Sequence, residues 1–230
     1  LKKKYNTKKI LDIIENFSKL EVTLVGDALF DIYCYVNTLG LTAKNPTISS
    51  EYLYKENYYG GVLATAQMMA SLGVKVNLIL YNHKNNITKN LLKNLDKSIK
   101  IIFINSKNKK NIIPSKTRFI NKTRDVKLFQ VSNINQIQLS EKEQNEFLML
   151  IKRSNSKNNF LIILDFGFGV FESKLIKNID KISKNIFLNV QTNSNNFGFN
   201  YFTKYKNFKY LSADKREFEF AMNKKIELNK

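Results

Sequence analysis

Residues 58–73 read YYGGVLATAQMMASLG, with Gly60 and Gly61 side by side immediately before an apolar segment that predicts a helix. The whole chain has only 8 glycines. A helix N-terminus presents free backbone N–H groups and the positive end of the helix dipole, and glycine lets a ligand approach this main chain closely. Close packing of the helix against a strand would also favour glycine, so the pair alone leaves a binding role and a packing role open.

The segments around this helix predict a mostly parallel α/β sheet. Residues 21–26, EVTLVG, form a short apolar run that ends in glycine, and residues 75–81, KVNLILY, follow the predicted helix at 62–72. Such continuous apolar runs are typical of parallel strands that are buried on both faces. Their alternation with helical segments continues along the chain and indicates a doubly wound sheet. Further strands are predicted at 100–105, 160–165, 186–190 and 210–212, and further helices at 86–95, 140–152, 174–184 and from 215 onward.

Two segments do not fit this pattern. Residues 47–59, TISSEYLYKENYY, and residues 116–131 alternate polar with apolar or aromatic side chains, which is typical of strands with one exposed face. They predict a small β-sheet lid on the main sheet. Residues 8–19, KKILDIIENFSK, space apolar residues at helical intervals and predict an amphipathic helix. We therefore expect a leading helix or linker at 1–20 and one α/β domain at 21–230.

The composition limits the classes of function. The chain has 230 residues, 43% of them hydrophobic, and a formal net charge of +19. The excess charge comes mostly from lysines that are spread along the chain among Asn and Ile, so a basic nucleic-acid-binding protein is the less favoured alternative. The charge should still attract anionic small ligands. Because the sequence has no run of about 20 apolar residues and no secretory signal, we expect a cytoplasmic protein with no membrane partner.

The chain has a single cysteine, Cys34, and a single histidine, His83. They allow neither an intrachain disulfide nor a metal site of several Cys and His ligands. Cys34 is expected to be a small buried residue, and His83 is expected to lie at the surface. We therefore expect no metal bound directly by protein side chains.

Four charged residues stand where α/β proteins often bind ligands. Asp27 and Asp31 follow the first strand, at the edge of the sheet where open α/β folds place ligand contacts. Two carboxylates there could accept hydrogen bonds from the hydroxyls of a polyol, or one could cap the following segment. Lys116 and Arg118 alternate on a predicted hairpin, so their side chains share one face. They could hold an anionic group, although a solvated charged strand is the favoured explanation from these residues alone.

Three more carboxylates are candidates further along the chain. Asp165 ends the apolar run FLIILD and is followed by a turn that contains two glycines, which favours a functional position over a purely structural one. Asp214 precedes the last predicted helix, and Glu217 comes three residues later. That spacing is the spacing of a capping box, so both residues have a structural explanation before any functional one.

Several of these segments occur in an order that resembles the ribokinase-type (PfkB) carbohydrate kinase family. The likeness is greatest to the heptose-phosphate kinase module of bifunctional ADP-heptose synthases, in a branch where this module follows a nucleotidylyltransferase domain. It covers residues 8–223. The segments that carry it are GDALFDIY at 26–33, YYGGVLATAQMMASLG at 58–73, KTRFI at 116–120, ILDFGFG at 163–169, NVQTNSNNFGFNYFTKY at 189–205 and DKREFEF at 214–220.

The resemblance implies a ribokinase-like, Rossmann-type α/β fold with a β-sheet lid, and a sugar bound between core and lid. It implies transfer of a phosphoryl group from ATP, with Mg²⁺, to a hydroxyl of a sugar or sugar phosphate, with a possible use in ADP-heptose synthesis. It also implies a nucleotidylyltransferase domain as covalent partner and a homodimer formed through the lid. The positions that match substrate contacts are Asp27, Asp31, Gly60, Gly61, Lys116, Arg118 and Asp165. The positions that match the N-x-x-E motif, which organises magnesium and phosphates, are Asp214 and Glu217.

The sequence also departs from the family. The family's Asn in the diglycine helix falls on Ala64, the Lys of its D-Y-x-K-G turn falls on Phe168, and the Asn of N-x-x-E is Asp214. The family's G-A-G-D segment, which carries the general base, would lie beyond Lys230. No catalytic residue is therefore assigned within the chain, and the C-terminal part of the domain is expected to be missing. The alternative function is a catalytically inactive sugar-binding or regulatory module.

Overall fold

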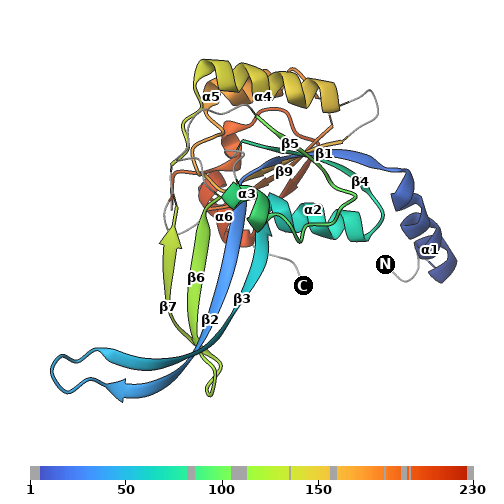
Figure 1. Cartoon of the computed structure of the whole chain (residues 1–230). Coiled ribbons are helices and arrows are strands. Elements are labelled where there is room, and N and C mark those ends of the chain that lie inside the picture. The colour runs from blue at the N-terminus through green and yellow to red at the C-terminus, as the bar shows by residue number, and fades with distance from the viewer. Residues whose placement is uncertain are drawn as a thin grey trace.

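The computed structural model describes residues 6–81, 86–104, 113–134, 136–155, 160–183, 185–192, 196 and 198–226. Figure 1 shows an α/β body from which a sheet of long strands projects. Two connections between the body and this sheet are short. Strand β1 (Glu21–Gly26) runs into β2 (Ala28–Leu41), and strand β3 (Ile48–Gly61) runs directly into helix α2 (Val62–Ser71).

The body is built on a six-stranded sheet. Besides β1, its strands are β4 (Lys75–Leu80), β5 (Lys100–Phe103), β8 (Phe160–Asp165), β9 (Ile186–Val190) and β10 (Tyr210–Ser212). The strand order is β10-β9-β8-β1-β4-β5, and all neighbouring strands are parallel. In β1 and β4 every residue after the first is buried. These continuous apolar segments therefore form the central strands that the sequence predicted.

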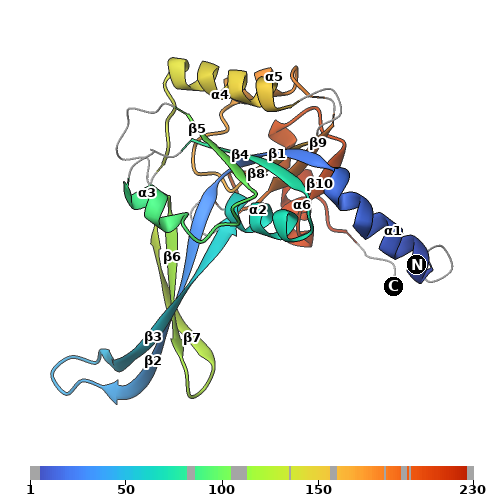
Figure 2. The ribbon, with the colours of Figure 1, turned by 45° about the vertical axis from the view of Figure 1, so that its right-hand side comes forward.

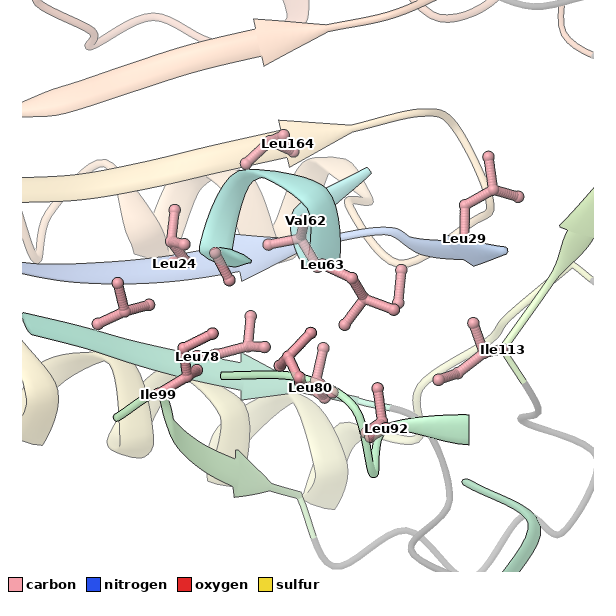
Figure 3. Packing of buried hydrophobic residues seen from close by; sticks show 14 of the residues in the cluster. Leu24, Leu29, Val62, Leu63, Leu78, Leu80, Leu92, Ile99, Ile113 and Leu164 are labelled. Carbon is pink, nitrogen blue, oxygen red and sulfur yellow. The ribbon is translucent and has the colours of Figure 1, made fainter. Parts of the chain in front are cut away.

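Helices cover both faces of this sheet. Helix α2 lies on one face, and helices α4 (Glu141–Ser154) and α5 (Ser173–Ile179) lie on the other (Figure 1). Successive residues of a strand point to opposite faces, so Leu24 packs in the cluster under α2 and Val25 packs in the cluster under α4 and α5. Figure 3 shows the first cluster, in which Leu63 of α2 meets side chains of β1 and β4.

Five shorter elements complete the described part of the body. Helix α1 (Thr7–Glu15) and a 3₁₀ turn (Asn16–Lys19) precede β1, helix α3 (Asn86–Leu91) follows β4, a 3₁₀ turn (Phe202–Lys204) precedes β10, and helix α6 (Lys215–Met222) follows it. Helix α1 buries none of its residues, although its sequence is amphipathic. In the described part of the chain, no helix is both long enough and apolar enough to cross a membrane.

The projecting sheet, which we call the lid, contains β2, β3, β6 (Ser115–Asn121) and β7 (Val126–Asn133), in the order β3-β2-β6-β7. Strands β2 and β3 form a long antiparallel hairpin, β2 and β6 are parallel, and β6 and β7 are antiparallel. Figure 2 shows the lid extending away from the body beyond α3. Because side chains alternate along each strand, the lid presents two faces of different chemistry.

The structure confirms the predicted fold, a mostly parallel α/β sheet with helices on both faces and a β-sheet lid. The predicted lid segments at 47–59 and 116–131 are β3 and the β6–β7 hairpin. The lid is nevertheless larger than predicted, because residues 28–41 form the long strand β2 at its centre.

Some boundaries differ from the predictions. The predicted helix at 8–19 is α-helical only to Glu15, and the helices predicted at 86–95 and 174–184 end at Leu91 and Ile179. Cys34 is buried, as expected. His83 lies outside the described residues.

Candidate functional site

The base of the lid is fixed to the body at Asp27, between β1 and β2. The backbone N–H of Asp27 donates to the carbonyl of Leu164 at the end of β8, over 2.9 Å, and the carbonyl of Asp27 accepts from the N–H of Val62, the first residue of α2, over 3.0 Å. The two strands that enter the lid therefore leave the body side by side. This arrangement places the start of the lid at the C-terminal edge of the sheet, next to β8.

The side chain of Asp27 is completely buried and accepts hydrogen bonds from the body itself. Its Oδ2 atom accepts from the backbone N–H of Phe166 over 2.6 Å and from that of Phe168 over 3.4 Å, and its Oδ1 atom accepts from the Tyr81 hydroxyl. Burial, and after it the charge of Asp165, raise the pKa of Asp27 from 3.8 to about 7. Asp27 thus connects the ends of β1, β4 and β8, and its oxygens face protein donors.

Gly60 and Gly61 are glycines for different structural reasons. Gly61 has φ +57° and ψ −134°, a conformation that residues with a side chain avoid, and a Cβ there would lie 2.2 Å from the carbonyl oxygen of Asp27. Gly60 does not have a positive φ. A Cβ on Gly60 would lie 3.1 Å from the Oδ2 atom of Asp31. Gly61 therefore satisfies a packing requirement, and Gly60 leaves space beside a candidate ligand residue.

One face of the lid brings together the other predicted site residues of this region. Asp31 lies opposite Lys116 in the register between β2 and β6, and Tyr33 lies opposite Arg118. Arg118 forms an ion pair with Asp31, and its guanidinium lies 5.3 Å from the centre of the Tyr33 ring. Lys116 is 9% exposed, and its burial lowers the pKa of its ammonium group. We call Asp31, Gly60, Lys116 and Arg118 the lid cluster.

Asp165 lies at the end of β8 and is 1% exposed. Its Oδ2 atom is 2.6 Å from the ammonium group of Lys204 and accepts from the Tyr205 hydroxyl over 2.7 Å, while its Oδ1 atom accepts from the N–H of Gly167 over 2.9 Å. Burial and the charge of Asp165 raise the pKa of the Tyr205 hydroxyl. The side chain of Asp165 is therefore surrounded by one cation and by the donors of Tyr205, Gly167 and Asn200.

Lys204 was not among the predicted site residues. It lies in the short 3₁₀ turn before β10, and besides Asp165 its ammonium group donates to Asn200 Oδ1 over 2.8 Å and to the carbonyl of Phe171 over 3.3 Å. It borders a hollow of about 330 Å³ at the end of β8. The polar and charged residues around this hollow are Gln136, Asp165, Glu172, Asn196, Asn200 and Lys204. Nothing in the local sequence around Lys204 indicates this contact, since it depends on the fold.

Asp214 and Glu217 form the capping box that their spacing predicted. The Glu217 N–H donates to Asp214 over 2.7 Å, and the Asp214 N–H donates to Glu217 Oε2 over 2.9 Å. Glu217 Oε1 also accepts from the N–H of Thr192 over 2.8 Å, and the Thr192 hydroxyl donates to the carbonyl of Asn200 over 3.1 Å. Since the Asn200 amide in turn donates to Asp165, hydrogen bonds connect the start of α6 with the end of β8.

The site residues thus fall into two groups, the lid cluster and the carboxylates at the ends of β8 and β10, with Asp27 and Gly61 at the junction between lid and body. Gly61 lies close to the turn after β8, because a Cβ on it would be 3.2 Å from the ring of Phe166. Among the described residues, no cluster of three or more His, Cys, Asp or Glu side chains could hold a metal ion.

No protein-family model and no curated protein matches the sequence, but solved structures match its fold. Phosphofructokinase-2 from Escherichia coli in complex with fructose-6-phosphate matches with a TM-score of 0.65 and 12% identity, over 91% of this chain and 65% of that chain. The tetrameric inhibited form of the same enzyme matches with a TM-score of 0.62 and 13% identity, over 91% and 66% of the two chains.

A third match comes from another organism. A possible 1-phosphofructokinase from Thermotoga maritima has a TM-score of 0.51 and 10% identity, over 89% of this chain and 57% of that chain. This protein therefore spans somewhat less than two thirds of the length of these enzymes. Within that span, it has the ribokinase-like fold of phosphofructokinase-2 and related carbohydrate kinases.

Proposed function

We propose that this chain is a carbohydrate kinase domain that binds a sugar phosphate beneath the lid and takes part in phosphoryl transfer from ATP to a sugar hydroxyl. The observation that carries the proposal is the lid cluster. A carboxylate, two cations and an open backbone position lie on one face of β2, β3 and β6. A carboxylate suits sugar hydroxyls, and Lys and Arg suit a phosphate group.

The sugar-phosphate class is favoured over a neutral sugar for two reasons. Lys116 and Arg118 place two cations against a single carboxylate, Asp31, so the lid cluster carries excess positive charge. The fold neighbour phosphofructokinase-2 was solved in complex with fructose-6-phosphate. Within this class we propose a heptose phosphate as substrate, and a nucleotidylyltransferase domain as partner, on the strength of the sequence segments that resemble ADP-heptose synthases.

ATP and Mg²⁺ would supply the transferred phosphoryl group and neutralise its charge. Both carboxylate oxygens of Glu217 already accept backbone N–H groups, from Thr192 and Asp214. Each oxygen retains a second lone pair, so Glu217 fits a role in binding the water shell of a magnesium ion better than a role as one of several direct ligands. In this proposal Glu217 orients metal-bound water, and Asp214 fixes the first turn of α6.

A second candidate is a sugar-binding module without phosphotransfer. It is favoured by Phe168, which takes the position of the family's lysine and is 1% exposed in the core. It is also favoured by Asp165, because Lys204, Tyr205 and Gly167 already bind its carboxylate. The two candidates share the sugar site and differ in ATP turnover. Assaying ATP hydrolysis and sugar phosphorylation across sugar phosphates separates them.

Replacing Asp31 with Ala is expected to weaken the binding of fructose 6-phosphate, used here as a probe, by about 10- to 100-fold. The reason is the loss of charge-assisted hydrogen bonds to sugar hydroxyls, each worth about 1.5–3 kcal/mol. Isothermal titration measures the affinity. The matched control is Glu51→Ala, which removes an exposed carboxylate from β3 of the same lid.

Arg118→Gln should mainly reduce the preference for fructose 6-phosphate over fructose, because it removes a phosphate-binding cation. If Asp31→Ala binds the probe as tightly as the unmodified protein does, Asp31 is not part of a sugar site. If the unmodified protein binds no sugar phosphate at all, the proposed function is wrong.

We also propose that the lid mediates self-association. Many of its large apolar and aromatic side chains are exposed, and fold neighbours include a tetrameric form of phosphofructokinase-2. Exposed apolar surface on this scale favours burial against another chain. The exposed residues are Leu39, Leu41, Ile48, Tyr52, Leu53, Tyr54, Tyr58, Val126, Phe129 and Val131.

Sedimentation velocity tests this proposal. Combining Tyr54→Lys with Phe129→Lys should shift the protein to monomer at micromolar concentration, because it places one charge on each face of the lid. Met149→Lys on α4, where the side chain is also about half exposed, should leave the association state unchanged. A monomeric unmodified protein, or equal effects of both changes, would contradict the proposal.

A further inference from the structure

The lid has a second face, and a groove lies between that face and the body. Along β2, Phe30 and Ile32 alternate with Asp31 and so point away from the lid cluster. On the neighbouring strands, Tyr59 lies opposite Phe30 on one side and Ser115 on the other. The residues of α3 and the turn after it form the other wall. The groove, which we call the rear groove, has a volume of about 430 Å³.

The floor of the rear groove is apolar and well packed. Phe30 is 7% exposed and Ile113 is 5% exposed, and the rings of Phe30 and Tyr59 lie 5.5 Å apart with a 57° tilt. Figure 3 labels Ile113 and Leu92, which belong to the same apolar cluster as Phe30. The floor is therefore a continuation of the core of the body, and a ligand there would bury apolar surface.

One wall of the groove is tied to the other. The Tyr59 hydroxyl donates to the carbonyl of Leu91, at the end of α3, over 3.2 Å. The backbone N–H of Asn94 also interacts with this hydroxyl. Tyr59 belongs to the lid and Leu91 and Asn94 belong to the body, so the groove is a preformed space that spans the two parts.

The rim of the groove is polar and positively charged. Lys55 of the lid and Lys93 of the body lie on its two sides, with three Asn side chains and one Ser hydroxyl, and none of the described residues that line it is Asp or Glu. Neither lysine takes part in an ion pair with any described residue. The remaining polar lining residues are Asn57, Asn90, Asn94 and Ser115.

We propose that the rear groove is a second binding site, for a small molecule that combines a phosphate or carboxylate group with an aromatic or branched apolar group. The apolar group would contact Phe30, Ile32 and Ile113, and the anion would lie between Lys55 and Lys93. The volume lies within the range of about 300–1,000 Å³ that is usual for small-molecule sites. The proposal does not depend on the sugar kinase activity, because the lid cluster lies on the opposite face of the same strands.

A ligand in the rear groove would touch lid and body at once. It would therefore stabilise the orientation of the lid seen here. If that orientation differs from the one that binds a sugar phosphate, the two ligands influence each other's affinity, and the influence is reciprocal. The rear groove would then act as a regulatory site.

Phenyl phosphate is a suitable probe, because it joins one aromatic ring to one phosphate. We expect it to bind with higher affinity than inorganic phosphate or benzyl alcohol, and to shift the backbone amide NMR signals of residues 57–59 and 90–94. Combining Lys55→Gln with Lys93→Gln should weaken its binding at least tenfold. The matched control combines Lys100→Gln with Lys127→Gln, which removes two exposed lysines elsewhere and should leave the affinity unchanged.

Two results would overturn the proposal. One is equal affinity of phenyl phosphate for the Lys55/Lys93 variant and for the control variant. The other is loss of binding on Arg118→Gln with signal changes confined to the lid cluster, since the probe would then occupy the opposite face of the lid. Thermal unfolding of each variant confirms that it is folded before binding is compared.

Discussion

Gly61→Ala is expected to destabilise the protein by about 3 kcal/mol or more. Its φ of +57° and ψ of −134° lie outside the regions open to residues with a Cβ, and strain of this kind costs on the order of 1–3 kcal/mol. The new Cβ would also lie 2.2 Å from the carbonyl oxygen of Asp27. That oxygen accepts the N–H of Val62, so relieving the clash would break the contact that starts α2 beside β1.

Gly60→Ala is the matched comparison, since it adds the same methyl group one residue earlier. Gly60 does not have a positive φ, and its Cβ would lie 3.1 Å from Asp31 Oδ2 and 3.3 Å from Leu29 Cδ2, which are the ends of two side chains. We expect a loss below about 1 kcal/mol and a weaker affinity for the sugar-phosphate probe. Urea unfolding measures both losses of stability. Equal losses in the two variants would contradict the assignment of a packing role to Gly61.

The pair of glycines shows how far local sequence can be interpreted. The composition of residues 58–73 predicted a helix that begins after two glycines, and α2 begins at Val62. The sequence could not separate the two glycines, because their roles depend on Asp27 and Asp31, which are distant in the chain. The carbonyl and the carboxylate that decide the matter come close only after β2 and β3 pair.

Strand β2 was missed for a related reason. It starts in the core, where Ala28, Leu29 and Phe30 are all buried, and it continues into a lid with two partly exposed faces. A strand with this change of environment has no single period of apolar residues along its length, so it does not match the pattern of a buried or a half-buried strand. By contrast, β1, β4 and β8 have one environment throughout, and their sequences predicted them correctly.

The candidate site was predictable where residues are neighbours in the sequence and not where they meet through the fold. The shared face of Lys116 and Arg118 and the capping box of Asp214 and Glu217 follow from spacing alone. The contact of Lys204 with Asp165 does not, because the two residues come from separate elements. The contact between Lys204 and Asp165 forms only when β8, β9 and β10 lie side by side in the sheet.

Asp27→Asn is expected to remove a large part of the pH dependence of stability. The pKa of Asp27 is raised to about 7 in the folded protein, from 3.8 in the absence of the fold, chiefly by burial. Between these values the folded state keeps a proton that the unfolded state releases, so the contribution of Asp27 to stability is greatest below about pH 4 and falls as the pH rises to about 7. At about 1.4 kcal/mol per pKa unit, the loss is on the order of 4 kcal/mol.

The two tyrosines near Asp27 do not change charge in this interval. Burial raises the pKa of the Tyr81 and Tyr205 hydroxyls, so both remain neutral. The oxygen of Asn can still accept the hydrogen bond from the Phe166 N–H, and its nitrogen can donate a hydrogen bond to the Tyr81 hydroxyl. Its amide stays neutral at every pH, so the variant should show a flat stability profile in this interval.

Urea unfolding at pH 5, 6, 7 and 8 tests the expectation. As the pH rises, the free energy of unfolding of the unmodified protein should fall relative to that of Asp27→Asn, because only the unmodified protein then carries a buried charge. Asp12→Asn on the exposed helix α1 should give a profile parallel to that of the unmodified protein. If Asp27→Asn also gives a parallel profile, Asp27 titrates near its ordinary value and the hydrogen bonds from Tyr81, Phe166 and Phe168 are strong enough to hold it ionised in the core.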